Sequence, residues 1–128
     1  MRLEPEGISV DFSENRMVLP MGTNTTRLQL GDTRPLLLAT LFNPDGSAVN
    51  LSGATVAFRM RNAVSRALVI NDQPATILSA GEGRVRYTWL AADTDTAGEF
   101  ESWFVVTYGA GEVESFPNRD SHKVRVEP

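Results

Sequence analysis

The chain has no cysteine among its 128 residues. Disulfide bridges, thiolate metal sites and cysteine nucleophiles are excluded together, so packing must stabilise the fold. This composition is compatible with folding in a cytosol. The sequence also lacks an apolar run of transmembrane length, and its first residues have neither the basic nor the apolar region of a secretory signal. We therefore expect no membrane partner, no membrane anchor and no Sec signal.

Basic residues are fewer than acidic ones, twelve against sixteen, which gives a formal net charge of −4. Nucleic-acid binding normally requires clustered lysines and arginines that displace counterions from phosphates. The nearest approach to such a cluster consists of Arg59, Arg61, Arg66, Arg84 and Arg86. Because these arginines alternate along two predicted strands, they indicate a solvated sheet face. We expect no nucleic-acid partner.

Residues that carry out catalysis are also scarce. His122, the only histidine, stands beside Lys123 in an alternating segment, and we expect it to face solvent. Triads assemble across space, so a Ser-His-Asp site stays open, but there is no Gly-x-Ser-x-Gly elbow to favour one. The carboxylates of Asp93, Asp95 and Glu99 could serve Ca²⁺, yet their pattern is more typical of a capped turn than of a calcium loop. The sequence predicts no enzyme, no catalytic residue, no metal site and no cofactor.

Short segments of alternating polarity dominate what is present. Residues 55–61, 84–90, 100–108 and 121–127 alternate with a period of two, and Gly109-Ala-Gly111 predicts a hairpin between residues 100–108 and 112–116. The apolar run 36–42 is compatible with a buried helix, but Pro35 and the turn after it favour a central strand buried on both faces. Seven or more such segments predict an all-β fold, an immunoglobulin-like antiparallel β-sandwich.

The sandwich should have one core and an extended N-terminal arm. We predict an arm over residues 1–26 and a single domain over residues 27–128. Ile8, Val10 and Phe12 alternate in the arm ahead of a polar stretch at residues 22–26, so the arm should pack on the domain or on another subunit. The residues expected to be buried between the sheets are Val56, Phe58, Met60, Tyr87, Trp89, Phe104, Val106 and Val124.

Aromatic residues could also form a sugar-binding platform. Most of them lie on alternating faces of predicted strands, which favours core packing. Trp103 is the best candidate for exposure, because it shares its face with Glu101 and Thr107. We therefore predict partner-binding residues at Ile8, Val10, Phe12 and Trp103.

An ordered set of turns and strands resembles the N-terminal immunoglobulin-like domain of tailed-phage baseplate upper proteins and related tail or head-fibre proteins. The set covers about residues 27–127 and comprises Gly31-Asp-Thr-Arg-Pro35, Asn43-Pro-Asp-Gly46, Val49-Asn-Leu-Ser-Gly-Ala-Thr-Val56 with Phe58-Arg-Met60, Gly83-Arg-Val-Arg-Tyr87, Asp93-Thr-Asp-Thr-Ala-Gly98 and Ser115-Phe-Pro117. In addition, the corner at residues 95–100 is similar to the approach to the penultimate strand of immunoglobulin domains, with Phe100 in the tyrosine position.

The resemblance implies a structural protein of a phage virion, a non-catalytic adaptor that docks in many copies onto other virion proteins of the tail, baseplate, neck or capsid. It implies synthesis in the host bacterial cytoplasm followed by incorporation into the virion. The alternative hypothesis is a carbohydrate-binding module that adsorbs to a host surface through exposed aromatic side chains.

Overall fold

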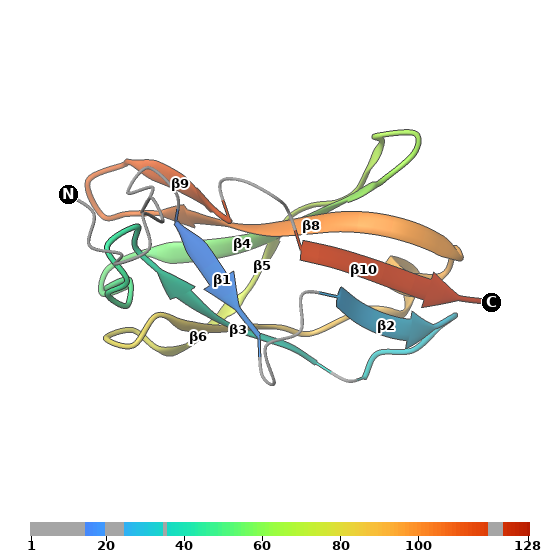
Figure 1. Ribbon diagram of the computed structural model, residues 1–128, viewed down its shortest axis with the longest axis horizontal. Helices are drawn as coiled ribbons and strands as arrows, with labels where there is room; N and C mark the ends of the chain where they lie inside the picture. Colours follow the sequence, from blue (N-terminus) through green and yellow to red (C-terminus); the bar gives the residue numbers. More distant parts are fainter. Residues whose placement is uncertain (1–14, 20–24, 35, 118–121) are drawn as a thin grey trace, which may run out of the picture.

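The structure is a computed structural model that describes residues 15–19, 25–34, 36–117 and 122–128. Its strands form two sheets that face each other (Figure 1). Sheet A has the order β1 (Arg16–Val18), β3 (Leu37–Phe42), β7 (Arg84–Tyr87) and β6 (Thr76–Ser79). Sheet B has the order β2 (Thr25–Gln29), β10 (His122–Glu127), β8 (Gly98–Thr107), β4 (Thr55–Asn62) and β5 (Leu68–Pro74), and β9 (Val113–Phe116) pairs with β8. A short 3-10 turn, η2, covers Ala91–Thr94. The predicted immunoglobulin-like β-sandwich is confirmed.

One strand pair departs from the antiparallel expectation. β1 pairs antiparallel with β3 in sheet A, whereas β2 runs parallel to β10 in sheet B. A parallel pair needs a long connection, and residues 30–121 lie between β2 and β10. The chain therefore contributes a strand to each sheet before residue 30. Because β2 is parallel to β10 and the other pairs are antiparallel, sheet B is a mixed sheet.

The core lies between the two sheets. All eight residues predicted to be buried there are buried. Phe58 is at its centre, where its ring stacks on Tyr87 at a centroid distance of 4.3 Å and meets Trp89 edge-on at 5.6 Å. Aromatic pairs in these geometries stabilise a core beyond the area they bury. The predicted hairpin of β8 and β9 is also confirmed, with Val105 opposite Ser115.

The prediction for the apolar run at residues 36–42 is wrong in one respect. β3 is a strand between β1 and β7, but only one of its faces is buried, through Leu37, Ala39 and Leu41. Leu38 on the other face is 39% exposed. The outer face of sheet A has no further layer over it among the described residues, so a continuous apolar run here does not indicate burial on both faces.

The predicted solvent exposure of His122 is wrong as well. The side chain is 3% exposed, and its Nε2 lies 2.8 Å from Thr26 Oγ1 of β2. β10 directs Val124 and Val126 into the core, and His122 has the same parity as these two valines. The alternation of buried and exposed residues along β10 therefore indicates the burial of His122 correctly. The charge of the neighbouring Lys123 does not.

The expected arm over residues 1–26 falls partly outside the described residues, as do Ile8, Val10 and Phe12. The described part differs from the expectation because Arg16–Val18 forms β1 and Leu19 belongs to the core cluster. Asn15 is anchored by its Nδ2, which donates to Glu114 Oε2 at 3.0 Å and to the Ser115 carbonyl at 2.6 Å. Residues 15–19 are thus part of the sandwich. Within the described part of the chain, no helix has the length and apolarity needed to cross a membrane.

Candidate functional site

The outer face of sheet A presents apolar side chains to solvent. Alternation along β1, β3 and β6 directs Val18, Leu38 and Leu78 away from the core, and they are 40%, 39% and 48% exposed. They surround a shallow groove of about 370 Å³, which we call the sheet A groove. It is lined by Val18, Leu19, Leu38, Ala39, Thr40, Leu78, Arg84 and Val85. Clustered exposed apolar groups of this kind mark interaction sites more often than single ones do.

Strand pairing explains why these residues meet. Val18 is opposite Thr40, Thr40 is opposite Arg84, and Arg84 is opposite Ser79 beside Leu78. The groove therefore runs across all four strands of sheet A. Neither Leu38 nor Leu78 stands out in the sequence, because they line one groove only when β7 lies between β3 and β6.

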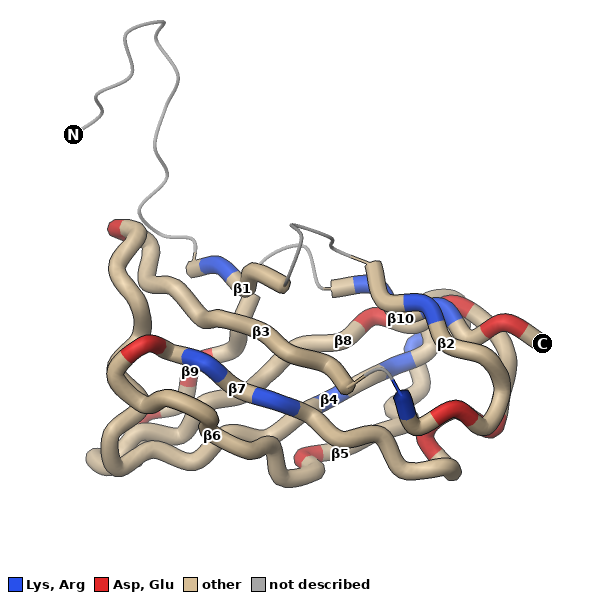
Figure 2. The backbone as a smooth tube through the Cα atoms, turned by 90° about the horizontal axis from the view of Figure 1, so that it is seen from below, with Lys and Arg blue, Asp and Glu red and all other residues tan. Residues whose placement is uncertain are grey.

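The same face carries positive charge. The four strands of sheet A contain Arg16, Arg84 and Arg86 and no aspartate or glutamate. Figure 2 shows the two β7 arginines as blue segments on an otherwise uncharged strand. Because the whole chain has a net charge of −4, sheet A is a basic surface on an acidic protein. Such asymmetry favours an acidic partner.

The three arginines are incompletely neutralised. Arg16 stacks its guanidinium over Phe42 at 5.6 Å from the ring centroid. Arg84 Nη1 lies 3.9 Å from Glu82 Oε1, and both side chains are more than half exposed, so this pair is weak. The Nε of Arg86 is buried and has no hydrogen-bond partner. A buried donor without a partner costs free energy, so this nitrogen contributes no neutralising contact to the charge of Arg86.

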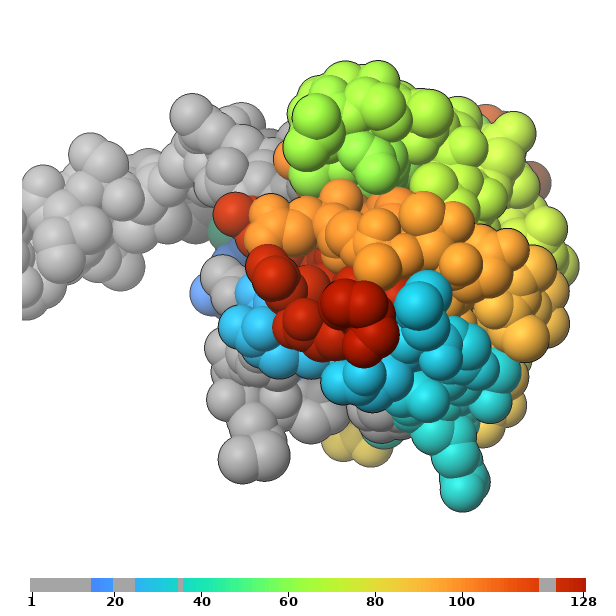
Figure 3. All heavy atoms as spheres, turned by 90° about the vertical axis from the view of Figure 1, so that its right-hand side faces the viewer, coloured from blue at the N-terminus to red at the C-terminus, as the bar shows by residue number. Residues whose placement is uncertain are grey.

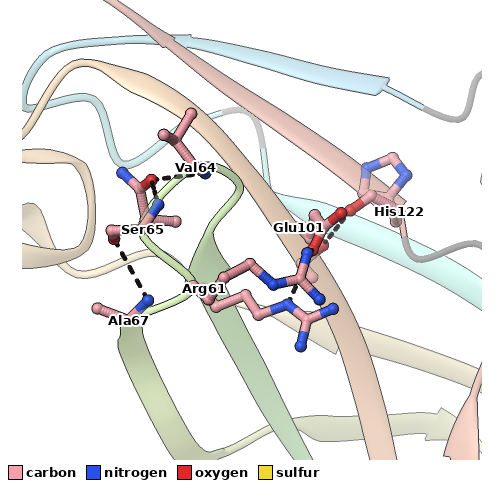
Figure 4. Close-up of polar contacts among 9 residues, drawn as sticks. Arg61, Val64, Ser65, Ala67, Glu101 and His122 are labelled. Atoms are coloured by element: carbon pink, nitrogen blue, oxygen red, sulfur yellow. Dashed lines mark hydrogen bonds and ion pairs between the residues drawn. The ribbon is translucent and has the colours of Figure 1, made fainter.

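The predicted binding residue Trp103 lies on the opposite side of the molecule, on the outer face of sheet B. It is half-buried, and the Arg61 guanidinium covers its ring at 5.1 Å. Arg61 reaches from β4 to Glu101 of β8 with a hydrogen bond of 2.8 Å, as Figure 4 shows. Arg66 donates to the same carboxylate at 3.0 Å. This face therefore satisfies its own charges, unlike sheet A.

The β4–β5 hairpin projects beside this face as a separate lobe (Figure 3). Its turn is fixed by Asn62, whose Oδ1 accepts hydrogen bonds from the amides of Val64 and Ser65, both at 2.8 Å. Val64 at the tip is 89% exposed. Between this hairpin, β8, β10 and β2 there is a hollow of about 230 Å³, lined by charged side chains such as Glu101, Lys123 and Arg125. Arg125 is paired there with Glu99 at 2.6 Å.

The acidic corner is built into the turn. Asp93 is buried and accepts hydrogen bonds from the Tyr87 hydroxyl at 2.6 Å and from the Leu90 amide at 2.8 Å. Burial and this carboxylate raise the pKa of Tyr87 far above its ordinary value. Asp95 bonds to Thr96, and Glu99 pairs with Arg125, so the three carboxylates face different partners. Among the described residues, no three His, Asp or Glu side chains gather as metal ligands.

Comparisons with known proteins give one kind of match. No family model matches the chain, and no curated protein matches it. Among solved structures, it is similar to CopC from Methylosinus trichosporium OB3b, with a TM-score of 0.52 over 89% of this chain and 94% of that one. The two sequences are 11% identical, so the likeness shows a shared β-sandwich fold.

These comparisons overturn the resemblance to phage baseplate proteins and the virion role inferred from it. CopC is a structural neighbour, and neither the family models nor the curated proteins point to phage proteins. The physical reason lies in the motifs. Asn43 and Gly46 close a turn with a hydrogen bond of 2.9 Å, and Gly53 and Gly83 occupy positive-φ positions. Such devices recur wherever short strands are joined, so they indicate the fold class and not the family.

The alternative hypothesis of a sugar-binding platform is also unsupported. Six aromatic residues, Phe58, Tyr87, Trp89, Phe100, Phe104 and Phe116, are buried in the core. Trp103 is covered by Arg61, and Phe42 by Arg16. Tyr108 is half-buried, packs against the core and donates its hydroxyl to Glu114 at 2.7 Å. The aromatic residues of the described part of the chain are thus engaged with the protein itself.

Proposed function

We propose that this chain is a non-catalytic docking module whose sheet A groove binds an extended, acidic segment of a protein partner. The observation that carries the proposal is the exposure of Val18, Leu38 and Leu78 around one groove, on a sheet whose strands carry arginines and no acids. Apolar side chains of the partner would cover the groove, and its carboxylates would meet the arginines.

An extended partner fits the shape of the surface. The groove is shallow and crosses four strands, so it offers contact along a line and not a deep pocket for a small molecule. A segment with alternating apolar and acidic residues presents apolar groups on one side only. Those groups would face the leucines, while the acidic ones reach toward Arg84 and Arg86 at the sides.

The non-catalytic part of the proposal is supported by the positions of the reactive groups. His122 is buried beside Thr26 on the opposite sheet, and Asp93 is engaged by Tyr87 in the turn. The hydroxyl nearest to His122, that of Thr26, holds the ring between β10 and β2, and the hydroxyl nearest to Asp93 belongs to Tyr87 in the core. These side chains therefore serve the fold.

Peptide binding tests this function directly. Two short fluorescein-labelled peptides, one alternating valine with aspartate and one alternating valine with lysine, should be titrated with the protein and followed by fluorescence anisotropy. We expect the acidic peptide to bind more tightly by at least about tenfold, and high salt to reduce the difference.

Variants locate the binding surface. Leu78→Glu places a carboxylate in the groove and should weaken the acidic peptide by about tenfold or more. Val64→Asp is the control, because it puts an acid on an exposed apolar position at the hairpin tip, away from the groove. Equal binding of the two peptides, or equal effects of the two variants, would contradict the proposed docking surface.

A further inference from the structure

We propose that the segment bound in the sheet A groove is the N-terminal segment, residues 1–14, of a second copy of this chain. The inference rests on the proposed function and names the partner for that groove. The molecule would thus supply both halves of its own interface. It would assemble by placing Ile8, Val10 and Phe12 of one copy against Val18, Leu38 and Leu78 of another.

Charge complementarity is the first argument. The N-terminal segment contains Glu4, Glu6, Asp11 and Glu14 against a single Arg2. The strands of sheet A contain three arginines and no acid, and the one carboxylate close to them, that of Glu82, lies 3.9 Å from Arg84 in a solvent-exposed pair. An acidic segment and an incompletely neutralised basic face within one sequence attract each other in trans.

The pattern and the length of the segment match the groove. Ile8, Val10 and Phe12 alternate with Ser9, Asp11 and Ser13, so an extended segment presents three apolar side chains on one side. Residues 8–12 span about 13 Å when extended. Four neighbouring strands span about 14 Å from the first to the last. Three apolar side chains can therefore cross the whole groove.

The route of the chain favours a second copy over the same copy. Asn15 is held by Glu114 and Ser115, and the chain then enters β1 directly. To reach its own groove, the segment would have to reverse its direction within residues 13–14, immediately before the anchored Asn15. It would also have to pass the Arg16–Phe42 stack, which lies between Asn15 and Val18 on that face. A second copy meets neither obstacle.

Sedimentation velocity of the full chain tests the proposal with two disruptive variants. Val10→Asp damages the segment and Leu78→Glu damages the groove; Leu38→Glu is a second groove variant should Leu78→Glu lose its β-sheet circular dichroism. We expect the wild type to associate with rising concentration and each variant to stay monomeric. An equimolar mixture of Val10→Asp and Leu78→Glu should form a heterodimer, because each supplies the part that the other lacks.

Matched controls keep these changes specific. Ser9→Asp adds an acid to the polar side of the segment, and Val64→Asp adds one at the hairpin tip; both should associate like the wild type. A monomeric wild type, or a mixture that stays monomeric, overturns the proposal, whereas the peptide titrations decide the docking function separately. If Val10→Asp associates normally and Leu78→Glu does not, the groove is the interface but another segment fills it. That result contradicts the assignment of the N-terminal segment and leaves the proposed docking function standing.

Discussion

At the residue scale, Trp89 stands out because it fills the core while its indole N–H has no hydrogen-bond partner. The side chain is 1% exposed and meets both Phe58 and Tyr87 edge-on. Its packing stabilises the fold, whereas its buried Nε1 donor opposes that stabilisation. The two contributions can be separated because phenylalanine retains an aromatic ring and has no donor.

Replacement of Trp89 should therefore depend on what replaces it. Trp89→Ala is expected to lower the free energy of unfolding by about 3–5 kcal/mol, because it leaves a large cavity. Trp89→Phe should cost only about 1 kcal/mol, since the unpartnered donor is lost together with part of the volume. Urea denaturation measures both. A Trp89→Phe loss as large as that of Trp89→Ala would contradict the prediction.

Tyr87 links stability to alkaline pH. Burial and the Asp93 carboxylate raise its pKa in the folded state, while the unfolded value stays near about 10. A group whose pKa is raised on folding contributes stability below its unfolded pKa, and that contribution is lost as the pH rises above it. The stability difference between wild type and Tyr87→Phe should therefore be constant below about pH 10 and shrink above it. Chemical denaturation over this pH range tests the prediction, and a difference that grows in alkali would contradict it.

At the element scale, the turn between β6 and β7 depends on one close backbone approach. Gly83 has a φ of +68°, and a Cβ on it would lie 2.6 Å from the Leu41 carbonyl oxygen and 3.2 Å from the Val49 amide nitrogen. The Gly83 carbonyl accepts from the Leu41 amide at 2.8 Å. This contact ties the turn to β3, and it thereby positions β7 at the centre of the sheet A groove.

Gly83→Ala should accordingly destabilise the protein by more than about 2 kcal/mol, because both the backbone conformation and the contact with β3 are affected. Gly81→Ala is the control in the same turn, since a Cβ there meets nothing within 4 Å. Thermal unfolding followed by circular dichroism compares them. A Gly83→Ala variant as stable as Gly81→Ala would refute the role of this turn.

Elements formed by contacts between sequence neighbours could be predicted from the sequence, and those formed by distant segments could not. The β8–β9 hairpin follows from a glycine-containing link between alternating strands. By contrast, β2 pairs with β10 across almost the full chain, and that pairing is what buries His122 against Thr26. Leu38 and Leu78 likewise line one groove only because β7 lies between β3 and β6, so the groove could not be predicted from the sequence. The outward direction of Arg84 and Arg86 could be predicted, because these residues alternate with apolar ones.

At the scale of the whole molecule, the two outer faces of the sandwich differ in how their charges are used. On sheet B, Arg59 pairs with Asp72 and Arg61 with Glu101, at 2.6 Å and 2.8 Å. On sheet A, the arginines surround exposed apolar groups and have few carboxylates near them. The arginines on the outer face of sheet B are therefore paired within the molecule. The outer face of sheet A is suited to a partner that brings both apolar groups and negative charge.

Methyl NMR of the ¹³C-methyl-labelled protein, titrated with the alternating valine–aspartate peptide, tests this central claim most directly. The account predicts that the methyl signals of Val18, Leu38 and Leu78 shift together and saturate with one dissociation constant. It also predicts that the signals of Val64, Leu68 and Val69 on the β4–β5 hairpin, which are at least as exposed as Leu38, stay in place. Shifts that concentrate on the hairpin, or the absence of shifts around the groove, would contradict it.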